Sequence, residues 1–508
     1  MDYLDPNKKR SHTRRLFLGY GLMAIVIGLG TILLVLLAYG YTFDRTSRTV
    51  IQNGLLFVQM GPINADVYVN GELHGSGNQR LVLPAGTYDI GIEAEGYKTW
   101  QNSVDLAGGA VERFQYPLLF PEEVSERTYR TFSEEPRLIT VSPDRRWLLI
   151  QEAEQADAFV LFDLRQQINL PTFFSLPVGI ISNSSADSQL DVVEWSNDNE
   201  HLIIRHSFDD TEEFILVNHN DVDQSQNLST RFADIDFTDI SLVDKQADQY
   251  HLFDRSTGEL AYAELAVDSV ELLLEDVLTY RSHGPETVLF TSISSHQQTE
   301  PDAAVEVNEE AEDKAYAYLY DEEELYLIDE LPSVEPSDYL LDLARFGGDW
   351  YVVIGTKEQQ RVVGYKNPVE QLDSNDNGAL SANFALRTEE VPSRISFSAN
   401  ARNVLLQTEK DVAAFDLERE RGYRYDFSDG AVSRLRWMDG HRIIGILDDQ
   451  LHVVDFDGEN RHELGSCKAG REPVFDTAYE HMYCIAPTDN DSYGALVRHA
   501  LLAPDDSD

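Results

Sequence analysis

The stretch "LITVSPDRRWLLI", from Leu138 to Ile150, places Ser-Pro-Asp between two short apolar runs. Both runs are rich in Leu, Ile and Val, so each is expected to form a β-strand. Between them, Pro fixes φ, and the side chains of Ser and Asp can accept hydrogen bonds from nearby backbone N–H groups. The stretch therefore predicts two antiparallel strands joined by a tight turn.

The same pattern returns along the chain. Clear copies are "VVEWSNDNEHLII" with Ser196 and Asp198, "ISFSANARNVLL" with Ser398 and Asn400, and the shorter "LRWMDGHRIIGI" with Asp439 and Gly440. Each copy is followed by a further apolar strand, as in 158–164, 213–219, 412–418 and 451–457. Weaker copies near 234–265, 278–331, 339–368 and 472–502 bring the candidate units to eight.

A repeat of about 40 residues with several short strands per unit is typical of a β-propeller. We therefore expect a mainly β protein with a propeller of seven or eight blades over residues 130–502. A row of sandwich domains is the alternative, although immunoglobulin-like modules need about 100 residues each. The phrase from Ser142 to Ile150 resembles the repeats of TolB-type propellers, in which Gly often follows the Asp. Arg145 stands in that position here.

Residues 51–118 predict a separate small β-domain. Asn70-Gly71 is a strong signal for a two-residue hairpin turn, and Tyr88, Ile90 and Ile92 alternate with polar residues or Gly, as in a half-buried strand. The segments "ADVYVNGELHGSG" (65–77) and "LPAGTYDIGIEAEGYKTW" (83–100) resemble the PEGA domain, although Ala85 and Thr87 depart from its Pro-Glu-Gly-Ala turn. The resemblance implies a β-sandwich-like module for structure or binding, without catalytic residues.

Residues 16–43 contain no charged side chain. As a helix this segment would measure about 42 Å, against about 30 Å for the hydrocarbon core of a bilayer. It predicts an uncleaved transmembrane helix, and a cleaved signal peptide is the alternative. The preceding residues 1–15 carry five basic and two acidic side chains, which predicts a cytoplasmic tail by the positive-inside rule. We expect a single-pass protein of the cell membrane with its C-terminal bulk outside the cytoplasm.

The chain has 89 acidic and 40 basic residues, a formal net charge of −49. Such a charge argues against nucleic acid as a partner, because nucleic acids are bound by basic patches. It favours a cationic or cation-bridged envelope protein or glycan, or simply keeps the protein soluble by self-repulsion. Residues 297–313 contain seven acidic and no aromatic residues and predict a solvated loop inserted into the fourth unit, with a docking segment for a basic partner as the alternative.

Few sequence features indicate chemistry. The segment "DSNDNG" offers Asp373, Asn375 and Asn377 with the spacing of the first half of a calcium loop. The twelfth position, where such a loop places a bidentate Glu, is Phe384. An ordinary polar loop without cofactor is therefore the alternative to a calcium site. Cys467 and Cys484, the two cysteines, are candidates for a disulfide or for separate burial as small apolar residues.

No Gly-x-Ser-x-Gly, Gly-x-x-x-x-Gly-Lys or His-Glu-x-x-His motif occurs in the sequence. We therefore expect a non-catalytic, membrane-anchored binding or scaffolding protein of the cell envelope. A propeller hydrolase acting on surface glycan or peptide is the alternative, and it would require a cluster of carboxylates or arginines at the channel. A third interpretation is a component of a larger envelope assembly.

Overall fold

The computed structural model describes the chain except for residues 1–5, 45–48, 62–63, 133, 152–156, 166–169, 184–187, 268, 294–313, 375–378, 428–431, 433–434, 489–490 and 504–508. The predicted acidic loop at 297–313 thus lies outside the described residues. The chain divides into two compact units, residues 1–122 and 123–508, which are described separately.

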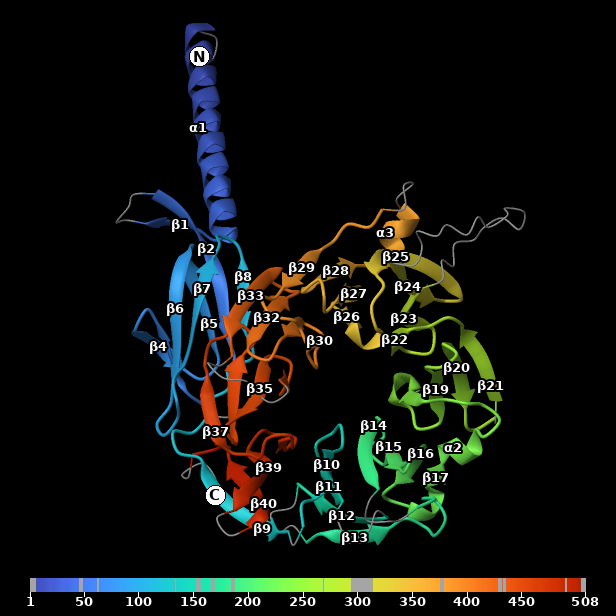
Figure 1. Cartoon of the computed structure of the whole chain (residues 1–508). Helices are drawn as coiled ribbons and strands as arrows, with labels where there is room; N and C mark the ends of the chain where they lie inside the picture. The colour runs from blue at the N-terminus through green and yellow to red at the C-terminus, as the bar shows by residue number, and fades with distance from the viewer. Residues whose placement is uncertain are drawn as a thin grey trace, which may run out of the picture. The chain divides into compact units, whose positions relative to one another are not determined.

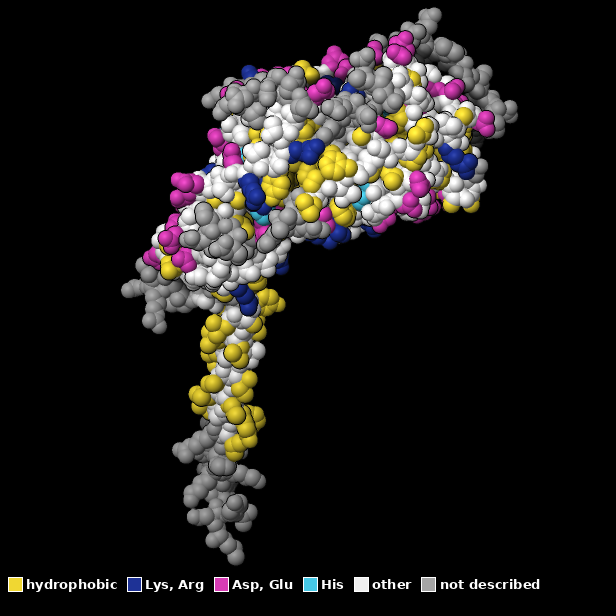
Figure 2. All heavy atoms as spheres, turned by 90° about the horizontal axis from the view of Figure 1, so that it is seen from below, with side chains coloured by type: hydrophobic (Ala, Val, Ile, Leu, Met, Phe, Trp, Pro, Cys, Tyr) yellow, Lys and Arg dark blue, Asp and Glu magenta, His cyan; other side chains and the backbone are white. Residues whose placement is uncertain are grey.

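The first unit begins with helix α1 (Pro6–Ala38). Its segment Leu16–Ala38 is long and apolar enough to cross a membrane, and Figure 2 shows its exposed apolar side chains. By length and composition this helix is compatible with a single-pass anchor or a signal sequence. The predicted helical span of 16–43 was too long at its C-terminal end. Gly40, with a φ of 78°, ends the helix, and Tyr41–Asp44 forms strand β1 instead.

Two four-stranded sheets follow in the first unit. One contains β1 (Tyr41–Asp44), β2 (Thr49–Val58), β5 (Gln79–Pro84) and β8 (Val111–Phe114), and the other β3 (Asp66–Val69), β4 (Glu72–Ser76), β6 (Gly86–Glu93) and β7 (Trp100–Leu106). Asn70 and Gly71 join β3 to β4 with φ values of 51° and 79°, the left-handed pair of a type I′ turn. The buried Trp100 contacts Phe114 and Tyr116 edge to face, with ring centres 5.3 and 5.9 Å away.

The second unit contains eight four-stranded antiparallel sheets in the described residues, which we number as blades 1 to 8. Blades 1 to 4 are β10 (Leu138–Val141), β11 (Trp147–Gln151), β12 (Ala158–Asp163), β13 (Thr172–Ser175); β14 (Gln189–Trp195), β15 (His201–Phe208), β16 (Thr211–Asn218), β17 (Gln226–Asn227); β18 (Asp239–Leu242), β19 (Gln249–Asp254), β20 (Glu259–Glu264), β21 (Ser269–Leu274); and β22 (Thr279–His283), β23 (Thr287–Ser292), β24 (Lys314–Asp321), β25 (Glu324–Pro332).

Blades 5 to 8 are β26 (Tyr339–Phe346), β27 (Asp349–Thr356), β28 (Arg361–Lys366), β29 (Phe384–Arg387); β30 (Arg394–Phe397), β31 (Asn403–Gln407), β32 (Asp411–Asp416), β33 (Arg421–Asp426); β34 (Arg436–Trp437), β35 (Arg442–Leu447), β36 (Gln450–Asp455), β37 (His462–Ser466); and β38 (Val474–Phe475), β39 (His481–Thr488), β40 (Asp491–Ala500) with β9 (Ser125–Thr131). Short helices α2 (Leu228–Arg231) and α3 (Pro368–Ser374), and single helical turns at 222–224, 243–245 and 336–338, lie between strands.

The sheets follow one another around a ring, with their first strands toward its middle (Figure 1). The ring is closed by β9, which precedes blade 1 in sequence but pairs with β40 as the outermost strand of blade 8. The predicted start of the propeller at residue 130 was therefore too late. The reason is composition: "SERTYRT" is largely polar and exposed and lacks the apolar run of the other strands. The expected fold class, mainly β with a propeller, is confirmed.

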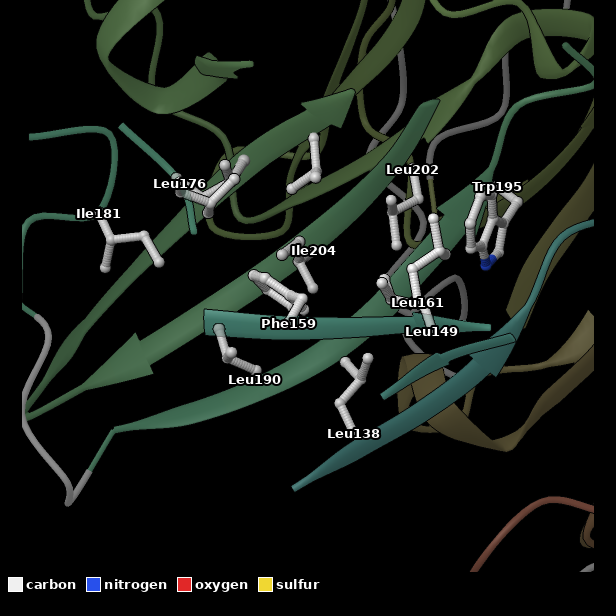
Figure 3. Packing of buried hydrophobic residues seen from close by; sticks show 12 residues of the cluster. Leu138, Leu149, Phe159, Leu161, Leu176, Ile181, Leu190, Trp195, Leu202 and Ile204 are labelled. Atoms are coloured by element: carbon white, nitrogen blue, oxygen red, sulfur yellow. The ribbon is translucent and has the colours of Figure 1, made fainter. Parts of the chain in front are cut away.

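Neighbouring blades share apolar cores between their faces. Leu149 and Leu161 of blade 1 lie in one cluster with Leu202 and Ile204 of blade 2 (Figure 3). The opposite face of blade 1 packs through Leu148 against Val474, Tyr483 and Leu496 of blade 8. Because both faces of each sheet are covered, the second strands are nearly continuous apolar runs, as in "LLI" and "NVLLQ".

Cys467, which follows β37, and Cys484 in β39 are joined by a disulfide with a Cα–Cα distance of 5.2 Å. Both side chains are fully buried. The bond links blades 7 and 8, because Cys467 lies at the end of one sheet and Cys484 on the second strand of the next. The disulfide therefore joins two neighbouring blades covalently.

Candidate functional site

We call the turn between the first and second strands of a blade its first turn, and in blades 1, 2 and 6 it carries the pattern Ser-x-Asp or Ser-x-Asn. In blade 1, Ser142 Oγ donates to Asp144 Oδ1 at 2.6 Å and accepts from the Trp147 N–H at 3.0 Å. Ser398 repeats both contacts in blade 6, with Asn400 Oδ1 at 2.8 Å and the Asn403 N–H at 3.0 Å. The recurring sequence pattern is thus a hydrogen-bonding device that closes the turn.

Several first turns contain a non-glycine residue in the left-handed region. These residues, with φ between 56° and 63°, are Arg145, Asn199, Lys245, Ala401 and Tyr479. This conformation costs an ordinary residue about 1–2 kcal/mol, whereas Gly adopts it freely. Blades 4 and 5 use Gly284 and Gly347 at such turns. Five blades therefore carry a side chain at a turn position where glycine would be less strained.

Two of these side chains, those of Arg145 and Tyr479, link the first turns of neighbouring blades. The guanidinium of Arg145 lies 4.2 Å from the ring centre of Tyr479, and Arg145 Nη2 and the Tyr479 hydroxyl both donate to the Met438 carbonyl, each at 3.3 Å. Thr477 Oγ1 donates to the Asp144 carbonyl at 2.8 Å. Blades 7, 8 and 1 are thus connected at their first turns by charge, ring and hydrogen-bond contacts.

The linkage continues on both sides. Asn199 Oδ1 accepts from the Asp144 N–H at 2.8 Å, and the Asn197 N–H donates to the Lys245 carbonyl at 2.8 Å, which joins blades 1, 2 and 3. Asn403 Nδ2 donates to the Gly440 carbonyl at 2.9 Å, which joins blades 6 and 7. We call the first turns of blades 6, 7, 8, 1, 2 and 3 the turn rim. It is a continuous, hydrogen-bonded band at one end of the propeller's inner strands.

A pocket of about 620 Å³ lies beside the turn rim at blades 2, 3 and 4. Its lining comes from the first strands β14, β18 and β22 and from the turns that follow them. Two cations, Lys245 and Arg281, are among the lining residues, together with three carboxyl groups, those of Glu194, Asp239 and Asp244. A volume of this size is typical of pockets for small molecules.

Two of the three carboxyl groups, those of Glu194 and Asp239, have partners in the protein, while Asp244 is exposed. Glu194 Oε2 accepts from the Leu242 N–H of the next blade at 2.9 Å. Burial raises the pKa of Glu194, while the Leu242 N–H and nearby Lys245 act in the opposite direction. Asp239 Oδ2 accepts from Arg255 Nη2 at 2.6 Å, which compensates its charge. Glu194 thereby satisfies a backbone donor at the inner edge of a sheet, where no further strand can pair.

Asp342, in blade 5, has the same role three blades further around the ring. Its Oδ2 accepts from the Phe397 N–H of blade 6 at 2.8 Å. Burial raises the pKa of Asp342, and the Phe397 N–H and the nearby Arg281 lower it by smaller amounts. The raised pKa values of Glu194 and Asp342 are thus explained by their positions on inner strands. They do not by themselves indicate a catalytic pair.

Comparison with protein families assigns the small β-domain. Residues 53–119 match the PEGA domain. No curated protein matches the chain. Solved structures with a similar architecture include the Dos1 propeller, with a TM-score of 0.44 and 11% identity over 74% of this chain and 96% of that one. Another is Porphyromonas gingivalis dipeptidyl peptidase 4, with a TM-score of 0.45 and 11% identity over 72% of this chain and 58% of that one.

An oligogalacturonate lyase in complex with manganese is also similar, with a TM-score of 0.39 and 11% identity over 73% of this chain and 99% of that one. At such identities the similarity concerns architecture and carries no activity across. The PEGA module together with a propeller architecture suggests an extracellular binding or scaffolding role.

Of the three predicted calcium ligands, only Asp373 lies in the described residues. Asp373 lies exposed near the end of α3, whereas Asn375 and Asn377 lie outside the described residues. A calcium site there stays a prediction. Phe384, at the position where a calcium loop would have Glu, is buried in β29 and stacks on Phe415 with ring centres 4.2 Å apart.

Another group with possible metal ligands, Asp476, Glu480 and His481, occupies the first turn of blade 8. Asp476 accepts from the Glu480 N–H at 2.9 Å and contacts His481 Nδ1 at 2.8 Å. These contacts close the turn in the way that Ser142 and Asp144 close that of blade 1. The cluster is therefore explained by turn formation, without a metal ion.

Lys245, Tyr280 and Arg281 were not singled out by sequence reasoning as site residues. Arg281 belongs to blade 4, where the Ser-x-Asp pattern is missing and the repeat is weakest. Its neighbour in the pocket, Lys245, belongs to another weak copy, 36 positions earlier in the printed sequence. Only the ring geometry brings the inner strands of blades 2, 3 and 4 together, so no local motif could have identified the pocket.

Proposed function

We propose that this chain is a membrane-anchored, extracytoplasmic binding or scaffolding protein of the cell envelope, which contacts its partner through the turn rim. The observation that carries the proposal is the network of contacts between the first turns of neighbouring blades, five of which hold a non-glycine residue in left-handed conformation. Strain of this kind persists where the surrounding structure compensates for it, and it is concentrated at functional sites. The compensation here is the network that links neighbouring turns.

A linked rim suits recognition because little conformational freedom remains to be lost on binding. Exposed carboxylates on these first turns, including Asp198, Glu200 and Asp244, give the surface its charge. The chain carries a net charge of −49, so a cationic or cation-bridged partner complements it. Binding through such groups weakens as salt rises, because the Debye length falls from about 8 Å at physiological ionic strength to about 3 Å at 1 M.

The location outside the cytoplasm has two supports. The apolar segment Leu16–Ala38 follows a basic tail, an arrangement that favours a cytoplasmic N-terminus. The disulfide between Cys467 and Cys484 is of a kind that persists in oxidising compartments and is rare in the cytosol. Both features favour a propeller that faces the outside.

The alternative of a propeller hydrolase acting on surface glycan or peptide would need a carboxyl group free to exchange a proton with substrate. Of the three carboxyl groups that line the pocket, Glu194 and Asp239 are already hydrogen-bonded, to the Leu242 N–H and to Arg255. Asp244 is exposed, but a glycosidase of the common kind needs two carboxyl groups that act together. This arrangement favours binding over catalysis. Assays on glycan and peptide substrates test the alternative, and turnover abolished by Glu194→Gln would establish it.

Site-specific photo-crosslinking in living cells tests the turn rim. Glu200 and Glu212 are both exposed, but Glu200 belongs to the first turn, just before β15, whereas Glu212 lies in β16 opposite Ser207, near the other end of β15. A photoreactive amino acid at position 200 is expected to give crosslinked adducts, and the same residue at position 212 serves as the matched control. Adducts from position 212 alone, or from neither position, would contradict the proposed contact surface.

A further inference from the structure

The pocket at blades 2, 3 and 4 brings two cations together with three carboxyl groups. Lys245 and Arg281 are exposed into it, and neither has a carboxylate partner within ion-pairing distance among the described residues. Arg281 Nη1 donates to the carbonyl of its neighbour Tyr280 at 2.9 Å, so its remaining guanidinium donors are available. In a chain with 89 acidic residues, two cations without ion pairs in one pocket require an explanation.

The nearby carboxyl groups do not neutralise these cations by contact. Asp239 is paired with Arg255, and Glu194 is occupied by the Leu242 N–H. Burial also raises the pKa of Glu194, which favours its neutral form more than in water. Asp244, the third lining carboxylate, is exposed and forms no ion pair with Lys245 or Arg281 among the described residues, so both cations stay available to a ligand.

The pocket also contains a pair of hydroxyl groups. Ser241 Oγ and the Tyr280 hydroxyl lie 3.0 Å apart, and both residues line the pocket. In such a pair one hydroxyl donates to the other, which leaves the second with an O–H to donate elsewhere. The pocket thus offers ammonium, guanidinium and hydroxyl donors together, a set that matches an acceptor-rich, negatively charged group.

We infer that this pocket binds a small organic anion through its carboxylate, held by Lys245 and Arg281. The planar guanidinium fits a carboxylate with two parallel hydrogen bonds, and the ammonium adds a second charge. Pockets of about 620 Å³ accommodate molecules the size of a sugar acid or the C-terminal end of a peptide. The site deepens the proposed binding role: the acidic rim attracts a cationic partner, while the pocket takes an anionic group.

The inference rests on the proposed function only in treating the propeller as a binding protein.

The experiment uses the purified full-length chain in neutral detergent and ligand-observed NMR. The probes are D-glucuronate beside neutral D-glucose, an acetylated dipeptide with a free C-terminal carboxylate beside its amide, and inorganic phosphate. We expect at least one carboxylate probe to bind while its neutral counterpart does not. The two carboxylate probes distinguish a sugar acid from a peptide end.

The variants Lys245→Gln and Arg281→Gln remove each charge while keeping a polar side chain. Each is expected to weaken carboxylate binding about tenfold or more, because a charge-assisted hydrogen bond contributes about 1.5–3 kcal/mol. Lys357→Gln is the matched control, since Lys357 pairs with Asp338 outside the pocket at 3.2 Å. Circular dichroism and thermal unfolding verify that all three variants are folded.

Several outcomes would overturn the inference. These are no binding of either carboxylate probe at millimolar concentration, equal binding of the neutral counterparts, tighter binding of phosphate than of carboxylate, or unchanged affinity in folded Lys245→Gln and Arg281→Gln. This titration does not depend on the cellular crosslinking from the turn rim. A negative result in one experiment therefore leaves the other interpretable.

Discussion

Arg145 and Tyr479 stack on one another across the closure of the propeller, with the guanidinium carbon 4.2 Å from the ring centre. Both residues have left-handed backbones, with φ values of 57° and 58°. They belong to the first turns of blades 1 and 8 and share the Met438 carbonyl of blade 7 as a hydrogen-bond acceptor. The contact therefore ties three first turns together at the point where the two ends of the ring meet.

This relationship predicts different effects for two substitutions of Arg145. Arg145→Ala loses the contacts with Tyr479 and Met438 but keeps the left-handed strain. Arg145→Gly loses the same contacts and relieves strain of about 1–2 kcal/mol. Arg145→Ala should therefore have the lowest midpoint of thermal unfolding, below both the wild type and Arg145→Gly. Equal midpoints for the two variants would show that the left-handed backbone at residue 145 is not strained.

The buried ion pair of blade 6 predicts a large loss of stability. Arg402 Nε and Nη2 donate to the two carboxylate oxygens of Asp416 at 3.0 and 2.7 Å, and the two side chains are 7% and 0% exposed. Arg402→Ala would leave the buried Asp416 with only two backbone N–H donors and no cation, and should lower the free energy of unfolding by about 3–5 kcal/mol. Denaturant titration measures this change.

The control for Arg402 is Lys314→Ala. Lys314 pairs with Glu330 at the surface, where the two side chains are 55% and 54% exposed. Exposed pairs contribute little to stability, so this variant should unfold close to wild type. A similar loss in both variants would refute the special contribution of the buried pair.

Reduction of the disulfide should weaken the joint between blades 7 and 8. The bond joins residues 17 positions apart, and a loop of that size corresponds to about 3 kcal/mol in the chain-entropy model. Thermal unfolding with and without reductant measures the effect. The double variant Cys467→Ala and Cys484→Ala should be insensitive to reductant. Two free thiols in protein purified from membranes under non-reducing conditions would contradict the bond.

His251 predicts a dependence of stability on pH. The imidazole is fully buried between neighbouring rings, and burial lowers its pKa from 6.5 to about 4. The folded state thus holds the neutral form, while the unfolded chain binds a proton at higher pH. The resulting stability is fully present above pH 6.5 and is lost as the pH falls toward about 4.

His251→Leu should flatten this dependence between those two pH values, as measured by denaturant titration at a series of pH values. Its control is His74→Gln, because His74 is exposed in the first unit. The dependence should persist in the His74 variant. An unchanged profile in His251→Leu would assign the acid sensitivity to other groups.

Much of the fold was predictable because its repeat is local. Ser142 with Asp144, and Ser398 with Asn400, mark turns whose hydrogen bonds are formed within five residues, so the sequence pattern and the structure coincide. The PEGA module was predictable for a similar reason, since Asn70-Gly71 determines its own turn geometry. The strand β9 was not, because it pairs with a strand at the other end of the chain.

The candidate site was less accessible to sequence reasoning. The left-handed conformation of Arg145 could be suspected from the glycine that it replaces in similar repeats. Its contacts with Tyr479 and Met438 could not, because they depend on closure of the ring. The same is true of Lys245 and Arg281, which share a pocket only because three inner strands lie side by side.

Hydrogen–deuterium exchange on the full-length chain tests the central claim, that the turn rim is the contact surface in the envelope. Exchange is compared between the protein in native membrane vesicles and the purified protein in neutral detergent. The account predicts slower exchange in vesicles for the first turns around Asp144, Asn199 and Tyr479, with the outer strands β13, β21 and β25 unchanged. High salt should reverse the protection. Protection confined to the outer strands, or identical exchange at the first turns in both preparations, would contradict the claim.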